Sequence, residues 1–477
     1  MNIGAVRDLP LLVAGEWAPG EGAAVVVMDK HRLTPWSAFR AASEAQVGRM
    51  VDAAHAAFTA GAPGPRERGE ILDRAAGRIA ALEARLIEAM QAEAGFTRSD
   101  AAGEVRRCIE TFRLSAVEAR GLAGEMIPIE GAPGQAGRLA FSLRVPLGVV
   151  LAVTPFNSPL NTVAHKVAPA FAAGNPVLLK PASATPETAC LLAEALLEAG
   201  MPAGFLSVAL GGAGVVRRAM EDERVRFIAF TGSTEVGRAI QQGAGLRRTQ
   251  MELGSIAFTI LMDDADLDAA LPKVVGAGYR KAGQVCTSVQ ILLVQRGLMP
   301  EVEARMTKLV AALPYGDPRS EGVVTGPLIS EAEARRVEAW IGEAVAAGAT
   351  ALVGGPREGA VVPPTLLKDA TPAMKVGCAE IFGPVVCIEP FDTLDEAVAR
   401  VNGTPYGLAT GLFTNRLCDA FAAARRLHVG AVHINETSSS RVDLMPYGGS
   451  KDSGFGREGP RHAVREMTEE RVVTIRA

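Results

Sequence analysis

From residue 149 onward, short apolar segments alternate with segments of helical spacing, and this alternation constrains the fold more than any other feature. The apolar segments span residues 149–153, 176–180, 205–209 and 227–230. Each is followed by a turn and then by apolar residues at helical spacing. Continuous apolar strands that alternate with helices are typical of a parallel sheet covered on both faces. We therefore predict an α/β protein with a doubly wound sheet.

A second alternation begins near residue 258, with strands expected at residues 291–294, 385–389 and 411–413. A chain of 477 residues has room for two or three domains. The second alternation therefore predicts a second doubly wound domain.

The remaining segments predict helices and one β-ribbon. Helical spacing covers residues 43–58, 66–94 and 104–121, whereas residues 127–143 combine glycines and two prolines with a closing alternation of apolar and polar residues. Residues 471–475 form a β-branched segment with no neighbouring strand in the sequence. Both strands leave unpaired edges, so we expect a dimer or tetramer in which the tail strand extends a sheet built partly from the neighbour's ribbon.

Composition argues against several functional classes. The chain carries 49 basic and 53 acidic residues, a net charge of −4, which does not favour binding to nucleic acid or to a membrane surface. No apolar run approaches the ~18 residues of a membrane span, and the N-terminus lacks the apolar core of a signal peptide. The six cysteines form no C-x-x-C pair and are too sparse for a disulfide framework, so we expect a reducing, cytoplasmic location. The six histidines show no metal-ligand spacing, and no metal is predicted.

Several motifs carry reactive or loop-forming residues. They are TPFNSP at 154–159, GNPVLLKP at 174–181, FTGSTEVG at 230–237, MELG at 251–254 with GQVC at 283–286, EIFGP at 380–384, and PYGGSKDSG at 446–454. Together and in this order, they resemble the NAD(P)-dependent aldehyde dehydrogenase superfamily. The pattern of residues 441–449 is most similar to the branch that contains the lactaldehyde, glyceraldehyde and phosphonoacetaldehyde dehydrogenases.

The resemblance implies a dinucleotide-binding domain, a catalytic domain and an oligomerisation arm. The first is expected at residues 1–126 and 148–251, the second at 252–452, and the arm at 127–147 and 460–477. The implied reaction is oxidation of an aldehyde to its acid through a cysteine thiohemiacetal and a thioester.

The catalytic residues implied by the resemblance match the demands of this chemistry. A thiolate that attacks an aldehyde forms an alkoxide able to expel hydride, which requires a reactive cysteine, donors for the oxyanion and a base for water. Cys286 is expected as the nucleophile, Asn157 as an oxyanion donor and Glu252 as the general base. The alternatives are a buried structural cysteine, an Asx turn at Asn157 and a solvated glutamate.

The cofactor residues are implied in the same way. Gly232 and Ser233 open a helix, whose N-terminal amides and dipole favour a pyrophosphate, although this is not the G-x-G-x-x-G fingerprint. The full expected set is Thr154, Phe156, Lys180, Ser183, Gly232, Ser233, Glu380 and Phe382. NAD-preferring relatives usually carry a glutamate where this chain has Ser183, and a carboxylate there would repel a 2′-phosphate. A serine can donate to that phosphate instead, so we expect NADP to be accepted and leave open whether it is preferred. Arg217 and Arg218 either bind this 2′-phosphate or are solvent-exposed helix residues without a role in cofactor binding.

The substrate pocket is read from positions that face it in the family. These positions hold Ser158, Asn161, His165, Arg280, Val285, Arg441 and Tyr447. Most are polar or basic, which favours a small hydroxylated or anionic aldehyde clamped by an arginine. The alternative is that Arg280 and Arg441 pair with neighbours such as Asp443. Val285 replaces a basic residue of the phosphonoacetaldehyde enzymes, which argues against that substrate.

The sequence thus predicts oxidation of a small polar aldehyde with NAD or NADP. A CoA-acylating semialdehyde dehydrogenase is the alternative among enzymes, but that branch generally lacks the base found here at Glu252. A catalytically silent structural or ligand-binding relative is the alternative of another class.

Overall fold

The computed structural model describes residues 6–476, so the outermost predicted boundaries, residues 1 and 477, lie outside the described part. Its first sheet has eight strands in the order β20-β12-β11-β8-β9-β10-β2-β3. The five central strands run parallel: β8 (Val149–Val153), β9 (Val177–Lys180), β10 (Leu206–Val208), β11 (Val225–Thr231) and β12 (Arg248–Glu252). Antiparallel strands close the edges: β2 (Leu11–Val13), β3 (Glu16–Ala18) and β20 (Gly454–Phe455). The predicted doubly wound sheet is confirmed, with antiparallel strands added at its edges.

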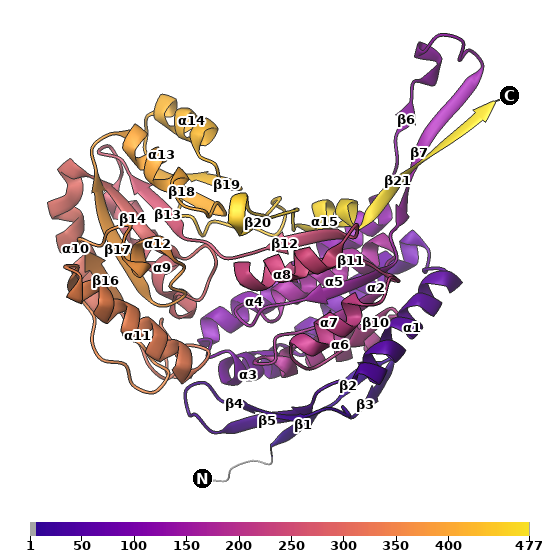
Figure 1. Ribbon diagram of the computed structural model, residues 1–477, viewed down its shortest axis with the longest axis horizontal. Coiled ribbons are helices and arrows are strands. Elements are labelled where there is room, and N and C mark those ends of the chain that lie inside the picture. The colour runs from indigo at the N-terminus through magenta and orange to yellow at the C-terminus, as the bar shows by residue number, and fades with distance from the viewer. Residues whose placement is uncertain (1–5, 477) are drawn as a thin grey trace.

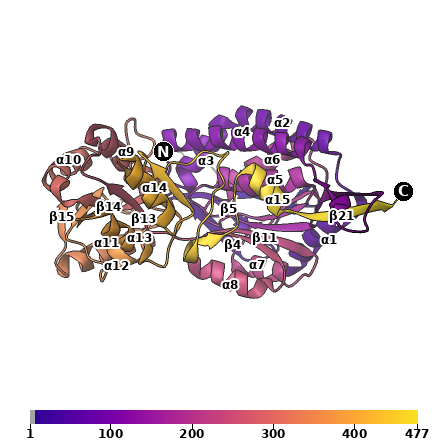
Figure 2. The same ribbon diagram turned by 90° about the horizontal axis from the view of Figure 1, so that it is seen from above.

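Helices cover both faces of this sheet (Figure 2). One face carries α2 (Pro65–Ala81), α3 (Glu83–Glu93), α4 (Arg98–Gly121), α5 (Asn161–Ala173) and α6 (Pro186–Glu198). The other carries α1 (Glu44–Ala60), α7 (Ala213–Met220) and α8 (Thr234–Ala244). The β8 strand and the α5 helix that follows it are wholly buried. This burial explains the continuous apolar sequence of β8, whereas α5 also buries Asn161, Thr162, His165 and Lys166.

The single helix predicted at residues 66–94 is wrong, because the structure divides it at Leu82 into α2 and α3. Apolar spacing persists across this break because both helices pack on the same side of the sheet. The N-terminal strands β1 (Arg7–Leu9), β4 (Ala24–Met28) and β5 (Pro35–Arg40), which form a separate small sheet, were also not predicted.

The second sheet has seven strands in the order β15-β16-β17-β14-β13-β18-β19. They are β13 (Ala257–Leu261), β14 (Val289–Gln295), β15 (Thr350–Val353), β16 (Thr365–Lys368), β17 (Val385–Phe391), β18 (Ala409–Phe413) and β19 (Ala431–Ile434), of which only β15 pairs antiparallel. One apolar core packs under α9 (Leu267–Tyr279) and α10 (Met299–Ala311). A second core packs under α11 (Glu331–Ala346), α12 (Lys375–Cys378), α13 (Leu394–Asn402) and α14 (Leu417–Arg426).

A three-stranded arm projects from the first sheet's helical layer (Figure 1). It consists of β6 (Met126–Ile127), β7 (Arg138–Pro146) and β21 (Thr468–Arg476), in the order β21-β7-β6. The tail strand β21 pairs with β7 of its own chain along its whole length, from Thr468 opposite Pro146 to Arg476 opposite Arg138. The ribbon that the tail strand extends is thus its own. The preceding helix α15 (Pro460–Glu466) packs on α5 and α4. The division into domains remains a prediction.

Within the described residues, no helix has both the length and the hydropathy needed to cross a membrane.

Candidate active site

A cleft of about 2060 Å³ lies at the carboxyl ends of β8, β9, β11 and β12. Residues that follow these strands form one wall, and segments 280–287, 329–336, 380–382 and 439–447 form the other. The carboxyl edge of a parallel sheet is where α/β proteins bind their ligands. A pocket for a drug-sized ligand measures about 300–1,000 Å³, so this cleft has room for a dinucleotide together with a small substrate.

The cleft brings together every predicted site residue except His165. His165 is on α5 but does not line the cleft, and only 1% of its side chain is exposed. The residue roles assigned from the sequence remain predictions.

Cys286 lies at the bottom of the cleft, after the short turn η2 (Arg280–Gly283). Its Sγ lies 2.9 Å from the Tyr447 hydroxyl. Burial raises the pKa of the Cys286 thiol to about 11, although the Tyr447 hydrogen bond acts in the opposite direction. The resting group is therefore a thiol, which needs a base or a bound cofactor to become a nucleophile. The other five cysteines do not line this cleft.

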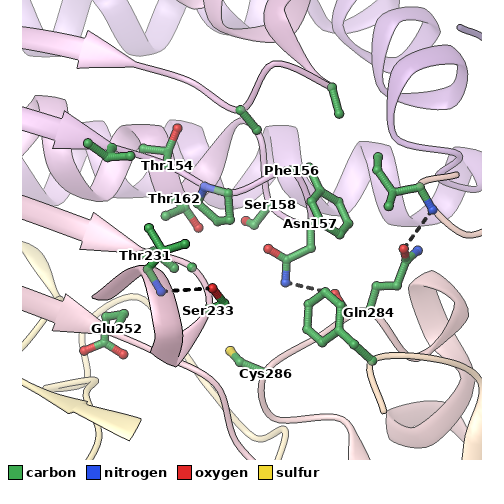
Figure 3. Close-up of a pocket in the computed structure, with 18 of the residues that line it drawn as sticks. Thr154, Phe156, Asn157, Ser158, Thr162, Thr231, Ser233, Glu252, Gln284 and Cys286 are labelled. Carbon is green, nitrogen blue, oxygen red and sulfur yellow. Dashed lines mark hydrogen bonds between the residues drawn. The ribbon is translucent and has the colours of Figure 1, made fainter. Parts of the chain in front are cut away.

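Glu252 is the last residue of β12. Figure 3 shows the side chains of Glu252, Cys286 and Asn157 around the same cavity. The Glu252 carboxylate is buried, and neither oxygen has a hydrogen-bond partner in the described structure. Burial and then the nearby Glu458 carboxylate raise the pKa of Glu252 well above its ordinary value. An unpartnered carboxyl with a raised pKa is suited to accept a proton from water or from a thiol.

Two ion pairs that share Glu458 lie close to Glu252. Lys166 Nζ donates to Glu458 Oε1 over 3.1 Å, and Arg441 donates to Glu458 Oε2 over 3.0 Å. Burial would raise the pKa of Glu458, but Lys166 and Arg441 outweigh it and bring that pKa to about 2. Glu458 therefore stays ionised, and its negative charge contributes to the raised pKa of Glu252.

Asn157 follows β8 and turns its amide toward the loop that carries Cys286 (Figure 3). Its Nδ2 donates to the Gln284 carbonyl over 2.9 Å. One of the two amide hydrogens remains for an oxyanion. Gln284 is itself held, because its Oε1 accepts from the Ile329 amide over 2.9 Å.

The cofactor end of the cleft lies at the start of α8, which Ser233 caps by accepting a hydrogen bond from the Val236 amide. Phe156 and Phe382, which also line the cleft, pack edge to face with ring centroids 5.9 Å apart. Burial lowers the pKa of Lys180 to about 8 and raises the pKa of Glu380 to about 7.

These residues fit a dinucleotide. The Thr154 hydroxyl is buried without a partner, and a Cβ added at Gly254 would come within 2.8 Å of Glu380 Oε2. An unsatisfied donor, a glycine-lined approach and a helix N-terminus form a suitable cradle for a pyrophosphate and its riboses.

The structure corrects one expectation about Ser183. Its hydroxyl donates to the Gly211 carbonyl over 2.7 Å, so its single hydrogen is already used. In this structure Ser183 therefore has no free hydroxyl hydrogen to donate to a 2′-phosphate. Arg217, on α7, lines this end of the cleft with no ion-pair or hydrogen-bond partner in residues 6–476, whereas Arg218 lies 4.0 Å from Glu221.

At the substrate end, the three polar residues from the start of α5 are already engaged. Ser158 Oγ donates to Glu104, and the Asn161 amide nitrogen does the same over 3.0 Å. The Asn161 side chain and His165 Nε2 contact Asp443 at 3.1 and 2.8 Å. These hydrogen bonds join α5 to Glu104 and Asp443. The expectation that His165 faces the substrate is wrong, because His165 does not line the cleft, whereas Ser158 and Asn161 line it with side chains that already have partners.

Three arginines line this end of the cleft. Arg107 forms a bidentate pair with Asp443 at 2.7 and 3.1 Å, and Arg441 pairs with Glu458 and stacks 3.7 Å above the Tyr447 ring. Arg280 donates to Ser439 over 2.8 Å and has no carboxylate within ion-pair distance among residues 6–476. The alternative of neighbour pairing therefore holds for Arg441, with Glu458 rather than Asp443, and does not hold for Arg280.

Sequence reasoning missed Glu104, Arg107, Lys166, Lys281, Gln284 and Glu458. Most come from helices or turns outside the reactive motifs, and a solitary charged residue in a helix gives no signal of burial. Gln284 stands inside the GQVC motif and could have been found there.

A partly buried thiol, an unpartnered carboxyl, an amide donor and a dinucleotide cradle in one cleft are the features of a cysteine-dependent oxidoreductase. The model of the aldehyde dehydrogenase family matches residues 17–473. The chain is 42% identical over 471 residues to a 3-sulfolactaldehyde dehydrogenase of Priestia aryabhattai, covering 98% of both chains.

Solved structures give the same result. Aldehyde dehydrogenase 21 from Physcomitrella patens, in complex with the reaction product succinate, superposes with a TM-score of 0.96 at 36% identity, covering 99% of each chain. The NADP-dependent glyceraldehyde-3-phosphate dehydrogenase from Bacillus halodurans, complexed with NADP, superposes with a TM-score of 0.95 at 32% identity, covering 98% of this chain and 99% of that one.

The chain belongs to the aldehyde dehydrogenase family. It is therefore an aldehyde dehydrogenase, an enzyme that oxidises an aldehyde with a nicotinamide dinucleotide as the hydride acceptor.

Proposed function

We propose that the substrate is a short aldehyde with a sulfonate or carboxylate at its far end. The observation that carries this proposal is Arg280, a cation at the substrate end of the cleft whose one side-chain contact in the described structure is the neutral Ser439. A charged guanidinium in a cleft gains most from a planar or tetrahedral anion that accepts from several of its N–H groups. Arg441 adds an unpartnered, buried Nε at the same end.

The charge balance supports the same substrate class. Arg107 and Arg441 are each matched by one carboxylate, whereas Arg280 is unmatched within residues 6–476. A hydrocarbon tail placed here would desolvate these groups without replacing their hydrogen bonds, at a cost of about 1–3 kcal/mol for each group.

The relatives' names also agree with an anionic tail. The reported relatives act on 3-sulfolactaldehyde, yield succinate, or act on glyceraldehyde 3-phosphate, which carry a sulfonate, a carboxylate and a phosphate respectively.

We assign the chemical roles as follows. The Cys286 thiol gives up its proton to water and its Sγ adds to the aldehyde carbon. The carbonyl oxygen, now an alkoxide, accepts hydrogen bonds from the Asn157 amide and the Cys286 backbone N–H. Bound NAD(P)+ supplies the hydride acceptor. Cys286 then carries the substrate as a thioester, and Glu252 takes a proton from the water that attacks it, which releases the acid and restores the thiol.

The alternatives are disfavoured by Glu252. Its buried, unpartnered carboxyl is suited to activating water, so transfer of the acyl group to CoA is not required. A catalytically silent relative would not need to keep Cys286, Glu252 and Asn157 around one cavity.

The test is a comparison of kcat/KM for 3-sulfolactaldehyde, succinic semialdehyde, glycolaldehyde, hexanal and benzaldehyde, with and without CoA. We expect the two anionic aldehydes to exceed hexanal and benzaldehyde by at least about tenfold. Arg280→Met should remove most of this preference by raising KM. Arg217→Met, which changes an unpaired arginine at the other end of the same cleft, is the matched control and should preserve it. A wild-type enzyme that prefers hexanal or benzaldehyde contradicts the proposal.

We also propose that the chain assembles with copies of itself through the arm. Residues paired across β7 and β21 share a face, and one face carries Leu139, Phe141, Leu143, Val473 and Ile475. Leu139, Leu143 and Ile475 are 45–47% exposed in the single chain. An apolar face of this kind on a projecting ribbon is suited to a partner subunit.

A cytoplasmic location is proposed from the cysteines. All six are free, and three of them are buried. Unpaired thiols are typical of a reducing compartment.

A further inference from the structure

The turn that precedes Cys286 adopts a backbone conformation that its residues disfavour. Lys281 and Ala282 have φ of 51° and 53°, and Gly283 follows at 70°. Glycine is required at the third position, because a Cβ there would come within 2.0 Å of the Gly383 carbonyl oxygen. Lys281 and Ala282 are not glycines, and residues with a Cβ rarely adopt the left-handed backbone conformation. They keep it only when contacts with the surrounding structure hold them there.

Lys281 has contacts strong enough to hold it. Its ammonium is buried, donates to Glu104 Oε1 over 2.7 Å and to the Asn157 carbonyl over 3.0 Å, and lies 4.2 Å from the Phe96 ring centroid. Burial lowers the pKa of Lys281, and Glu104 opposes this change.

Glu104 ties the same turn to the loop after β8. It accepts from Ser158 Oγ and from the Asn161 amide as well as from Lys281. Burial would raise the pKa of Glu104, but Lys281 and Arg107 lower it below its ordinary value. Lys281 Nζ thus makes two hydrogen bonds, and both carboxylate oxygens of Glu104 accept hydrogen bonds.

The contacts between the two loops are reciprocal. The Lys281 side chain binds the Asn157 backbone, and the Asn157 side chain binds the Gln284 backbone. The oxyanion donor and the nucleophile come from different sheets, so these contacts fix their separation.

We propose that Lys281, held by Glu104, is a positioning residue that sets the Asn157 amide against the carbonyl oxygen of a substrate on Cys286. Lys281 touches neither substrate nor cofactor in this role. It acts by keeping the left-handed turn in place.

The test uses Lys281→Met and Glu104→Gln in the full-length enzyme. Because an oxyanion donor misplaced by about 1 Å can cost about 10²-fold in rate, Lys281→Met should lower kcat at least about 30-fold while KM for NAD(P) stays within about twofold. The loss should be equal for succinic semialdehyde and for glycolaldehyde, since both form the same oxyanion. This equality separates the proposal from the anionic-substrate proposal, which can fail independently.

Alkylation of Cys286 by iodoacetamide supplies a readout that a general structural defect would move. Alkylation forms no oxyanion. In Lys281→Met its rate should therefore stay within about threefold of the wild-type rate, and its pH midpoint should stay close to the wild-type midpoint. Glu104→Gln should show a smaller loss of kcat in the same direction, and the double variant should lose little more than Lys281→Met alone, because the two residues act as a unit.

Glu389→Gln is the matched control, since it breaks a partly buried pair with Arg400 that does not line the cleft. It should lower thermal stability and leave kcat within about twofold. The proposal is overturned if Lys281→Met and Glu104→Gln behave like this control, or if the two losses simply add in the double variant. If Lys281→Met does not fold, Glu104→Gln alone decides between these outcomes.

Discussion

The Tyr447 hydroxyl lies 2.9 Å from the Sγ of Cys286, and this contact joins the late loop to the nucleophile. Its hydrogen bond lowers the pKa of the Cys286 thiol, whereas burial, the larger effect, raises it. Tyr447 is held in place by the Arg441 guanidinium stacked on its ring. The loop therefore influences both thiol reactivity and the substrate end of the cleft.

Tyr447→Phe should make Cys286 less reactive. Removing the hydroxyl removes the hydrogen bond that favours the thiolate, so the pKa of Cys286 should rise and alkylation by iodoacetamide near neutral pH should slow by about tenfold. The rate of alkylation against pH measures this change. Tyr406→Phe is a suitable control, because Tyr406 does not line the cleft. An unchanged or lower midpoint in Tyr447→Phe would show that the contact does not stabilise the thiolate.

Glu252→Gln should separate acylation from hydrolysis. An amide cannot take a proton from the attacking water, so rapid mixing with aldehyde and NADP should give one equivalent of NADPH followed by a stall. If no burst appears and alkylation of Cys286 also slows, the base acts on the thiol instead. Full steady-state turnover would exclude Glu252 as the base.

The pH profile of kcat should report the ionisation of Glu252. Its pKa is raised by burial and then by the Glu458 charge, and only the ionised form is a base, so kcat should rise with pH through this pKa. Glu458→Gln removes a negative charge and should move that limb to lower pH, by at least about 0.5 unit. Glu466→Gln, an acid that contacts Gln250 on the same strand, should leave the limb in place. Movement toward higher pH in Glu458→Gln would falsify the electrostatic account.

Cofactor preference should respond to two positions at the far end of the cleft. Ser183→Glu should shift the kcat/KM ratio toward NAD by at least about tenfold, or ~1.4 kcal/mol, because a carboxylate repels the 2′-phosphate. Arg217→Met should raise KM for NADP and leave KM for NAD within about twofold. Arg218→Met, next to it on α7, is the control. If the ratio changes in neither variant, these positions do not contact the ribose.

Charge on the apolar face of the arm should weaken assembly. Sedimentation should show wild type as a dimer or tetramer, and Leu143→Asp should shift it to a smaller species at micromolar concentration, since a buried unpaired carboxylate is unfavourable in an interface. Val472→Asp places the same charge on the other face of β21 and should have the smaller effect. A wild-type monomer would contradict the proposed assembly.

The alternation of apolar strands and helices was sufficient to predict both sheets, because strands buried on both faces have an unmistakable composition. It did not predict β1 to β5, because these strands of 3 to 6 residues belong to a small separate sheet or to the antiparallel margin of the first sheet, outside the alternation of strands and helices. Leu82 gave no sign of a break, because it is neither glycine nor proline.

The reactive residues were predictable because they occur in motifs. The residues that hold them were not, because a partner such as Glu104 or Asp443 is recognised only by what it contacts. Glu104 lies 177 residues from Lys281, and Asp443 lies 336 residues from Arg107. Pairing of this kind depends on the tertiary structure, and no local pattern records it.

The most direct test of the account is mass spectrometry of the Glu252→Gln enzyme after mixing with NADP and either succinic semialdehyde or hexanal. The account predicts that succinic semialdehyde adds a four-carbon acyl group, as a thioester, to the peptide that contains Cys286, and that hexanal adds its acyl group far more slowly. An acyl group found on another residue, or faster labelling by hexanal, would contradict it.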